Sequence, residues 1–225
     1  MKAMKLSRLA FGVSLLSMVP ASARADVVTF NFESIAVASG LTTLTLSGGG
    51  LTATLTRPGD TFGIFNLAAV FPAGDPSFGQ RSLDPFAHEQ NNTPFLLNFS
   101  QAVTGLSIDM GDYGADTDVL TIQLWSGANG AGTLLGSSSI TLFGGGSDFS
   151  FLTPSVTSAP ALSAVFIGGS SAPDLPTAPN GYPNSVYYDN IKVTFGTTTT
   201  PEPGTLALFA TGLVGLGFRR RRKNA

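Results

Sequence analysis

The chain has 225 residues, a formal net charge of −2 and no cysteine, which excludes disulfide bonds, thiolate catalysis and cysteine-ligated zinc. Residues 26–200 hold three cations against thirteen acidic side chains, so this part has a net charge of −10. Such an acidic body excludes nucleic acid as an expected partner and favours cations or neutral ligands.

Residues 1–25 have the three-part pattern of a secretory signal peptide. A basic opening precedes an apolar helical stretch at residues 9–19, and small residues follow it. The sequence Ala23-x-Ala25 fits cleavage after Ala25. We therefore expect the general secretion machinery to export the chain and signal peptidase to remove this N-terminal signal helix.

Residues 26–196 are expected to form one all-β domain. Short runs rich in Thr, Val, Phe, Ile and Leu alternate with clusters of Gly, Ser, Pro, Asn and Asp, which is typical of strands and turns. The predicted strands are residues 27–32, 42–46, 51–56, 61–65, 95–99, 103–110, 119–125, 133–140, 148–151, 162–167 and 186–195.

Several of these runs alternate apolar and polar residues with a period of two. The apolar sets are Leu106, Ile108 and Met110; Leu120, Ile122 and Leu124; and Ile191, Val193 and Phe195. One packed face and one solvent-exposed face per strand predict an antiparallel β-sandwich with a jelly-roll-like topology. Two turn-rich stretches, 72–94 and 172–184, are expected to be loops.

Four carboxylates lie close together in the sequence: Asp109, Asp112, Asp116 and Asp118. Because Ca²⁺ takes six to eight oxygen ligands, such a turn could hold one. The order of these residues is not that of an EF-hand loop. The alternative is a solvated turn in which the carboxylates accept hydrogen bonds from nearby backbone N–H groups.

Hydrolytic chemistry has little support in the sequence. His88 is the only histidine, and no Gly-x-Ser-x-Gly motif accompanies it. No acidic pair stands out by its spacing as that of a glycosidase. We therefore expect no enzymatic activity, with a secreted hydrolase of unrecognised site as the alternative.

The C-terminal tail has three consecutive parts after a spacer of four threonines, 197–200. They are the tripeptide Pro201-Glu202-Pro203, an uncharged stretch at 204–218, and five cations at 219–223. A helix of fifteen residues spans about 22 Å, which is short of the roughly 30 Å hydrocarbon core. The stretch therefore predicts a marginal and removable membrane anchor whose cations stay in the cytoplasm.

This order of parts in residues 201–225 resembles the PEP-CTERM sorting signal of Gram-negative, biofilm-forming bacteria. The resemblance implies processing by an exosortase, a membrane protease and transpeptidase, in hosts that usually make exopolysaccharide. It implies a transient inner-membrane anchor and then a place at the cell surface, the outer membrane or the extracellular matrix. An ordinary tail anchor that begins with Pro-Glu-Pro is the alternative.

The two ends of the domain carry a second resemblance. Phe32-Glu33 at the end of the first strand and Asp189-Asn190 in the last one are similar to residues of jelly-roll carbohydrate-binding modules and galactose-binding-like domains. That resemblance implies a structural Ca²⁺ held by Glu33 and Asp189. Strand alternation with Ile191 predicts that Asp189 points inward, where it needs a metal or hydrogen bonds.

Two aromatic residues are candidate ligand contacts, because rings with a polar edge stack on the apolar faces of sugars. Tyr113 lies within the acidic turn, and Trp125 ends a strand. The alternative for Trp125 is a place in the sandwich core. We expect a non-enzymatic surface or matrix protein that contacts exopolysaccharide, with a purely structural surface domain as another alternative.

Replacing Pro201 and Pro203 with alanine should abolish sorting, because a sorting enzyme must recognise the tripeptide whereas a plain anchor needs only its apolar stretch and cations. Surface labelling of intact cells measures the displayed fraction. Unchanged display of the double variant would leave only the ordinary anchor.

Overall fold

The computed structural model describes residues 25–67, 76–85, 93–112, 117–143, 149–169 and 186–196. The four-threonine spacer, the sorting tail and all of the predicted signal peptide except Ala25 lie outside them, and so do both predicted helices. Arg24–Thr197 forms one compact unit. The part of the chain that the structure describes contains no helix long and apolar enough to cross a membrane.

The described fold is built from antiparallel strands, which confirms the predicted all-β class. The strands are β1 (Ala25–Phe30), β2 (Ala38–Leu41), β3 (Thr43–Gly48), β4 (Leu51–Thr56), β5 (Phe62–Asn66), β6 (Arg81–Asp84), β7 (Phe95–Asp112), β8 (Thr117–Trp125), β9 (Leu134–Phe143), β10 (Ser150–Leu152), β11 (Ser155–Ile167) and β12 (Tyr187–Gly196). A single short 3₁₀ turn, η2 (Ala128–Gly130), lies between β8 and β9.

The long strand β7 takes part in both layers of the sandwich. From Phe95 its first part pairs with β4 and with the second part of β11. From Val103 its second part pairs with β12 and with the first part of β11. Register shifts in β11 around Ala161 mark the change of layer, since strands commonly switch sheets at bulges. One hydrogen-bonded sheet thus folds over itself.

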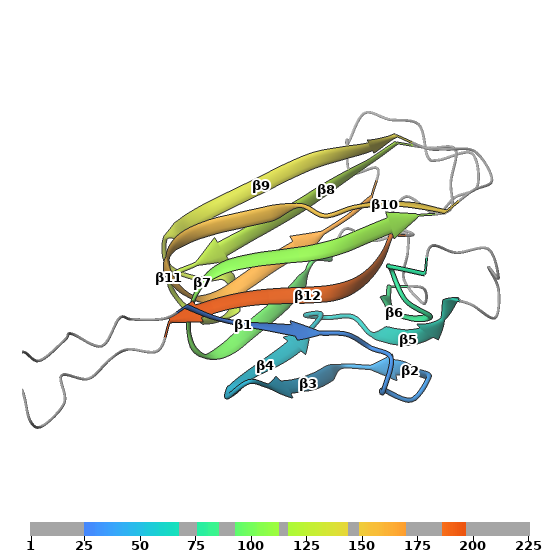
Figure 1. Ribbon diagram of the computed structural model, residues 1–225, viewed down its shortest axis with the longest axis horizontal. Helices are drawn as coiled ribbons and strands as arrows, with labels where there is room; N and C mark the ends of the chain where they lie inside the picture. Colours follow the sequence, from blue (N-terminus) through green and yellow to red (C-terminus); the bar gives the residue numbers. More distant parts are fainter. Residues whose placement is uncertain are drawn as a thin grey trace, which may run out of the picture. The chain divides into compact units, whose positions relative to one another are not determined.

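One layer has the order β3-β4-β7-β11-β8-β9, and the other has the order β2-β5-β6-β12-β7, with β10 and the first part of β11 on the other side of β7. β1 lies beside β12 along the second layer, and Ala25 is opposite Gly196 (Figure 1). The first and last strands of the domain are therefore direct neighbours.

The core lies between the inner faces of the two layers. All nine apolar residues that the period of two predicted to face inward are at most 3% exposed. Phe95 lies at the centre, stacked on Phe166 at 5.2 Å and in edge contact with Tyr188 at 5.3 Å. Each large side chain buried in this way contributes about 1.5–3 kcal/mol, so core burial is the main source of stability.

Arg57 is the buried cation of the described fold, at 3% exposure. Its Nε donates to the carbonyl of Thr93 and its Nη1 to that of Pro85, and it forms an ion pair of 3.4 Å with Asp60. The guanidinium also lies over the ring of Phe95. Arg57 thereby joins the turn after β4 to the chain around β6 and the start of β7.

Three pieces of strand were not predicted from the sequence: β2, β6 and the first part of β11. β6 lies within the stretch 72–94 that was expected to be a loop, and it pairs with β5 and at one position with β12. The two predicted strands 95–99 and 103–110 are one continuous strand, β7. These corrections leave the sandwich architecture unchanged.

Candidate functional site

A β-bulge interrupts β12 close to its start. Asp189 lies opposite Asp109 of β7 and Lys192 lies opposite Ser107, so β12 has one extra residue in this interval. Asn190 lies in this bulge. Its φ of 47° is in the left-handed region, which asparagine tolerates better than most residues. The bulge reverses the faces of β12 on its two sides.

The bulge overturns the expectation that Asp189 points into the core beside Ile191. Opposed residues of an antiparallel pair share a face, so Asp189 lies on the outer face with Asp109, whereas the neighbouring Met110 faces the core. Asp189 is nonetheless 0% exposed, because segment 76–80 covers it. The expected burial is present, but the cover is a loop segment and not the opposite layer.

Glu33 and Asp189 meet beside Gly79. A Cβ built on Gly79 would lie 2.6 Å from Asp189 Oδ2 and closer still to Glu33 Oε1. The two carboxylate oxygens are therefore separated by no more than the sum of these distances, about 5 Å. Glu33 Oε1 also accepts hydrogen bonds from the backbone N–H groups of Gln80, at 2.6 Å, and Arg81, at 3.1 Å.

Gly79 makes this approach possible for two reasons. Its φ is 101°, which residues with a Cβ rarely adopt, and any side chain would overlap the two carboxylates. Gly79 was not among the predicted site residues. A glycine in a turn-rich stretch gives no sign that a distant carboxylate pair closes on it.

The two oxygens of Asp189 have different environments. Oδ1 accepts the N–H of Asn190 at 2.7 Å and that of Phe32 at 3.4 Å, whereas Oδ2 has no hydrogen-bond partner. Burial raises the pKa of Asp189 to about 7. The hydrogen bonds from Asn190 and Phe32 oppose the rise, and the negative charges of Glu33 and Asp109 add to it.

A hard cation fits this arrangement. A buried carboxylate oxygen without a partner faces a second carboxylate within about 5 Å, and Ca²⁺ binds such oxygens at about 2.3–2.6 Å. Within the described ranges no three acidic or histidine side chains are grouped to hold a metal ion. A cation here would therefore take its remaining ligands from backbone oxygens or water.

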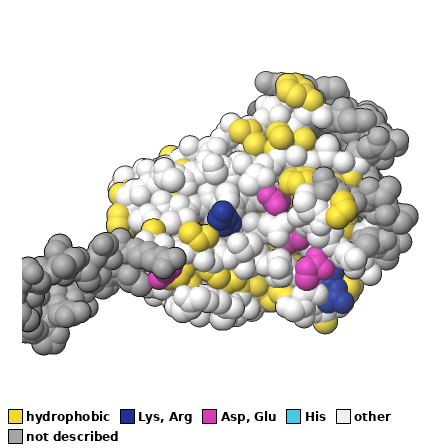
Figure 2. Space-filling view, in the orientation of Figure 1, with side chains coloured by type: hydrophobic (Ala, Val, Ile, Leu, Met, Phe, Trp, Pro, Cys, Tyr) yellow, Lys and Arg dark blue, Asp and Glu magenta, His cyan; other side chains and the backbone are white. Residues whose placement is uncertain are grey.

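Asn190 and Asp109 form a polar link beside this pair. The Asn190 side-chain amide donates to Asp109 Oδ2 at 2.9 Å and to the carbonyl of Ser77 at 3.0 Å. Asp109 Oδ1 accepts the hydroxyl of Thr153 at 2.6 Å. These bonds hold the covering segment against β7 and β12. Figure 2 shows acidic side chains near the start of β12 on a largely uncharged surface.

The second predicted Ca²⁺ cluster is not assembled from its described members. Asp109 lies on the outer face and is engaged by Asn190 and Thr153, while Asp112 and Asp118 are buried at 4% and 2% exposure. Asp116 lies outside the described residues, as does the candidate ligand contact Tyr113. The expected turn is also shorter, because β7 continues to Asp112.

Trp125 lies outside the core, on the outer face of β8. Its neighbour Leu124 is fully buried, and Trp125 itself is half-buried. The indole N–H donates to Gln123 Oε1, two residues back on the same face, at 3.3 Å. Across the sheet, Trp125 lies opposite Ser163 of β11, which in turn lies opposite Asn98 of β7.

A loop after Trp125 is fastened onto this outer face. The Asn98 amide donates to Asn129 Oδ1 at 2.8 Å and accepts the backbone N–H of Asn129 at 2.7 Å. Ser163 Oγ donates to the carbonyl of Gly127 and accepts the N–H of Gly130. Trp125 is thus placed at the border of an ordered loop. We call the outer side of β8, β9 and the second part of β11 the Trp125 face.

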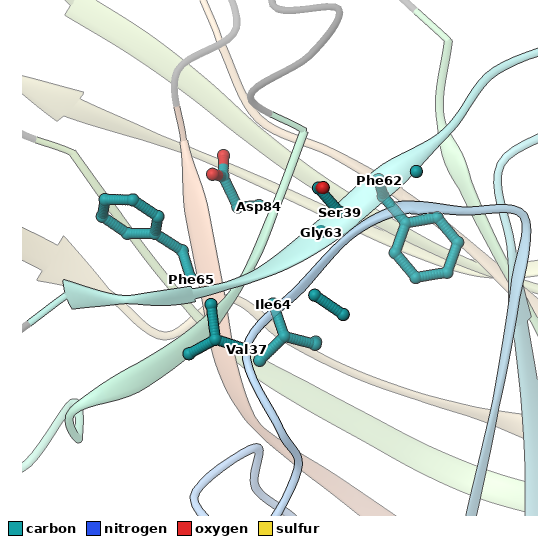
Figure 3. Close-up of a pocket in the computed structure, with 9 residues that line it drawn as sticks. Val37, Ser39, Phe62, Gly63, Ile64, Phe65 and Asp84 are labelled. Carbon is teal, nitrogen blue, oxygen red and sulfur yellow. The ribbon is translucent and has the colours of Figure 1, made fainter.

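A separate pocket of about 290 Å³ lies between β2 and β5 (Figure 3). Its lining is mainly apolar and includes Val37, Phe62 and Ile64, with Asp84 as its carboxylate. Burial lowers the pKa of Arg57, and Asp84 is among the acidic groups that oppose this. The Asp84 charge therefore has a structural partner. None of the predicted site residues lines this pocket.

The C-terminal tail matches a known family of sorting motifs. Residues 199–222 match the family model of the PEP-CTERM protein-sorting motif. The chain carries a PEP-CTERM motif. This confirms the resemblance found in residues 201–225 and marks the chain as an exported protein that an exosortase processes. The PEP-CTERM match covers the tail and does not extend to the β-sandwich.

Two solved structures have similar β folds. One is an arabinose-bound α-L-arabinofuranosidase, with 11% identity and a TM-score of 0.38 over 77% of this chain and 26% of that one. The other is a mutant of a family 29 carbohydrate-binding module, with 12% identity and a TM-score of 0.28 over 76% and 92%. No curated protein sequence matches the chain.

Without bound cation, the protein should lose stability as the pH rises. The pKa of Asp189 is about 7 in the folded state against an ordinary 3.8, so the folded state keeps a proton that the unfolded state releases. This contribution of Asp189 to stability is fully present below its ordinary pKa of 3.8, and it is lost as the pH rises through about 7. Thermal melts in EGTA measure it. Asp189→Asn should remove most of the slope, and equal slopes in both proteins would contradict the assignment.

Proposed function

We propose that this is a non-enzymatic surface or matrix protein whose β-sandwich contacts a neutral exopolysaccharide through the Trp125 face. The proposal rests on the position of Trp125, the only tryptophan. It lies outside the core, on a sheet face without charged residues. Export and exosortase processing bring such a domain to the surface where exopolysaccharide lies.

The chemistry of the Trp125 face suits a sugar. An aromatic ring packs against the C–H face of a sugar ring, while neutral hydroxyl and amide groups exchange hydrogen bonds with its hydroxyls. Beside Trp125 stand Gln123 and Thr121, and the Thr121 hydroxyl is 3.0 Å from that of Ser139 on β9. No charged residue occurs between Asp118 and Asp148, so nothing here selects a charged ligand.

We also propose a route by which the domain reaches the surface. Signal peptidase removes residues 1–25, the tail holds the chain transiently in the inner membrane, and exosortase cleavage then transfers the domain to the outer membrane or the matrix. The Pro-Glu-Pro tripeptide, Pro201 to Pro203, is the proposed recognition element. The compact unit Arg24–Thr197, without the two residues that leave with the signal peptide, is the cargo.

We assign Glu33 and Asp189 a structural Ca²⁺, distinct from the glycan contact. The cation would neutralise two carboxylates that converge on Gly79, and it would join the end of β1 to the start of β12 and to segment 76–80. No catalytic step is assigned to it. The two sites lie in different layers of the sandwich, so each can be tested independently.

Two other functions remain as alternatives. A hydrolase would need His88, the only histidine, which lies outside the described residues. Turnover of a polysaccharide that disappears in His88→Ala would favour this alternative. A purely structural surface domain would show neither turnover nor glycan binding.

Trp125→Ala should weaken glycan binding by about tenfold or more, since loss of a central aromatic contact commonly costs more than about 1.4 kcal/mol. Glycan arrays and titration with the host's own exopolysaccharide measure the change. Tyr113→Ala tests the second candidate ring, and Val27→Ala, exposed on β1, is the control. Equal binding by Trp125→Ala and wild type would reject the Trp125 face.

Ca²⁺ should raise the melting temperature, and EGTA should lower it. A ligand of the folded state alone stabilises by about 2.7 kcal/mol at about 100 times its dissociation constant. Glu33→Gln and Asp189→Asn should abolish the response, whereas Asp26→Asn, at the start of β1, should keep it. A wild-type melting temperature that is the same in Ca²⁺ and EGTA would reject the cation site.

A further inference from the structure

β9 forms the free edge of one layer. The strand runs from Leu134 to Phe143 and pairs with β8 along its length. Among the described strands none pairs with its other side, and the layer order ends at β9. Unpaired backbone N–H and C=O groups along an edge of ten residues are a template for another strand.

This edge lacks the usual protection against pairing. Edge strands of soluble proteins commonly carry lysine, another inward charge, proline or a very short length. β9 has no charged residue and no proline, and the uncharged stretch extends from Val119 to Ser147. Two of the exposed large apolar side chains stand at its two ends, Phe143 at 75% and Leu134 at 43% exposure.

We propose that β9 pairs antiparallel with β9 of a second copy of this chain and forms a symmetric dimer. A two-fold interface needs a self-complementary surface. The middle of β9 is the run of small residues Ser137 to Ser139, and the large apolar residues lie at its ends. An axis near Ser139 brings Phe143 of each copy to the start of the partner strand, beside Leu134.

The faces of the side chains agree with this pairing. Phe143 lies on the same side of β9 as exposed Ser139 and Thr141, by alternation. Leu134 lies opposite Trp125, on the outer face of β8, because a register shift follows Leu124. Phe143 and Leu134 therefore stand on one side of a sheet that continues through both copies, where they can pack together.

Charge favours a second copy over a charged partner. The domain has a net charge of −10, so two copies repel unless they meet at an uncharged surface. The Glu33, Asp109 and Asp189 side chains belong to the layer that contains β12, and β9 is the far edge of the other layer. A basic or acidic partner would find no charge on β9 to pair with.

The opposite edge of the same layer provides a matched comparison. β3 is also uncharged, but it has six residues and none of the exposed large apolar side chains. Thr45 is exposed in the middle of β3, as Ser137 is in β9. A lysine at either position adds the same charge to an edge strand of the same layer.

Sedimentation velocity of the full chain in mild detergent tests the dimer. Wild type should show a concentration-dependent dimer, and Ser137→Lys should raise its dissociation constant by about tenfold or more, because a lysine on an edge strand hinders pairing with another strand. Phe143→Ser should also weaken it, and Thr45→Lys should not. A monomeric wild type, or equal effects of Ser137→Lys and Thr45→Lys, would overturn the proposal. Dimers insensitive to every β9 substitution would overturn it as well, by pointing to association through the tail.

Cysteine substitution locates the axis, because the natural chain has no cysteine to interfere. Under mild oxidation, at least one of Ser137→Cys, Ser139→Cys and Thr141→Cys should form a disulfide-linked dimer with an unchanged melting temperature. Thr45→Cys on β3 should remain a monomer on the gel. Equal cross-linking at Thr45→Cys and at the β9 positions would again overturn the assignment of β9.

Discussion

The burial of one acidic side chain sets the local structure at one end of this domain. A carboxylate without contact to water is costly unless hydrogen bonds or an opposite charge compensate for it. The backbone N–H groups of Phe32 and Asn190 donate hydrogen bonds to Oδ1 of Asp189, and Oδ2 faces Glu33. Because the partners come from the end of β1, from segment 76–81 and from β12, this single carboxylate ties together parts of the chain that are distant in sequence.

Much of the fold followed from local patterns. Alternating residues such as Ile108, Ile122 and Val193 predicted their inward faces correctly, since a strand with one dry face needs this spacing. The strands that were not predicted form because of the strands that they pair with. Ala159 and Pro160 in β11 have little intrinsic tendency to form strands, and the strand runs through them because Thr157 and Ala161 on either side pair with β7.

Glu33 and Asp189 lie close together beside Gly79, but the predicted inward face of Asp189 was wrong. Alternation was counted back from Ile191, and this count fails because Asn190 adds one residue to the strand. A bulge depends on the register of the neighbouring strand, which a single strand does not encode. Gly79 was missed for a related reason, since its role depends on Glu33 and Asp189, which are far from it in sequence.

The ladder between β1 and β12 joins residues about 170 positions apart, with Ala25 opposite Gly196. An exported chain crosses the membrane from its N-terminus, so β1 emerges first and has no ladder partner until the last strand has followed it. Contacts this distant in sequence form late, because the entropy of closing the chain must be paid first. The topology therefore keeps the domain open while it is being translocated, and it allows closure only when the whole sandwich is outside.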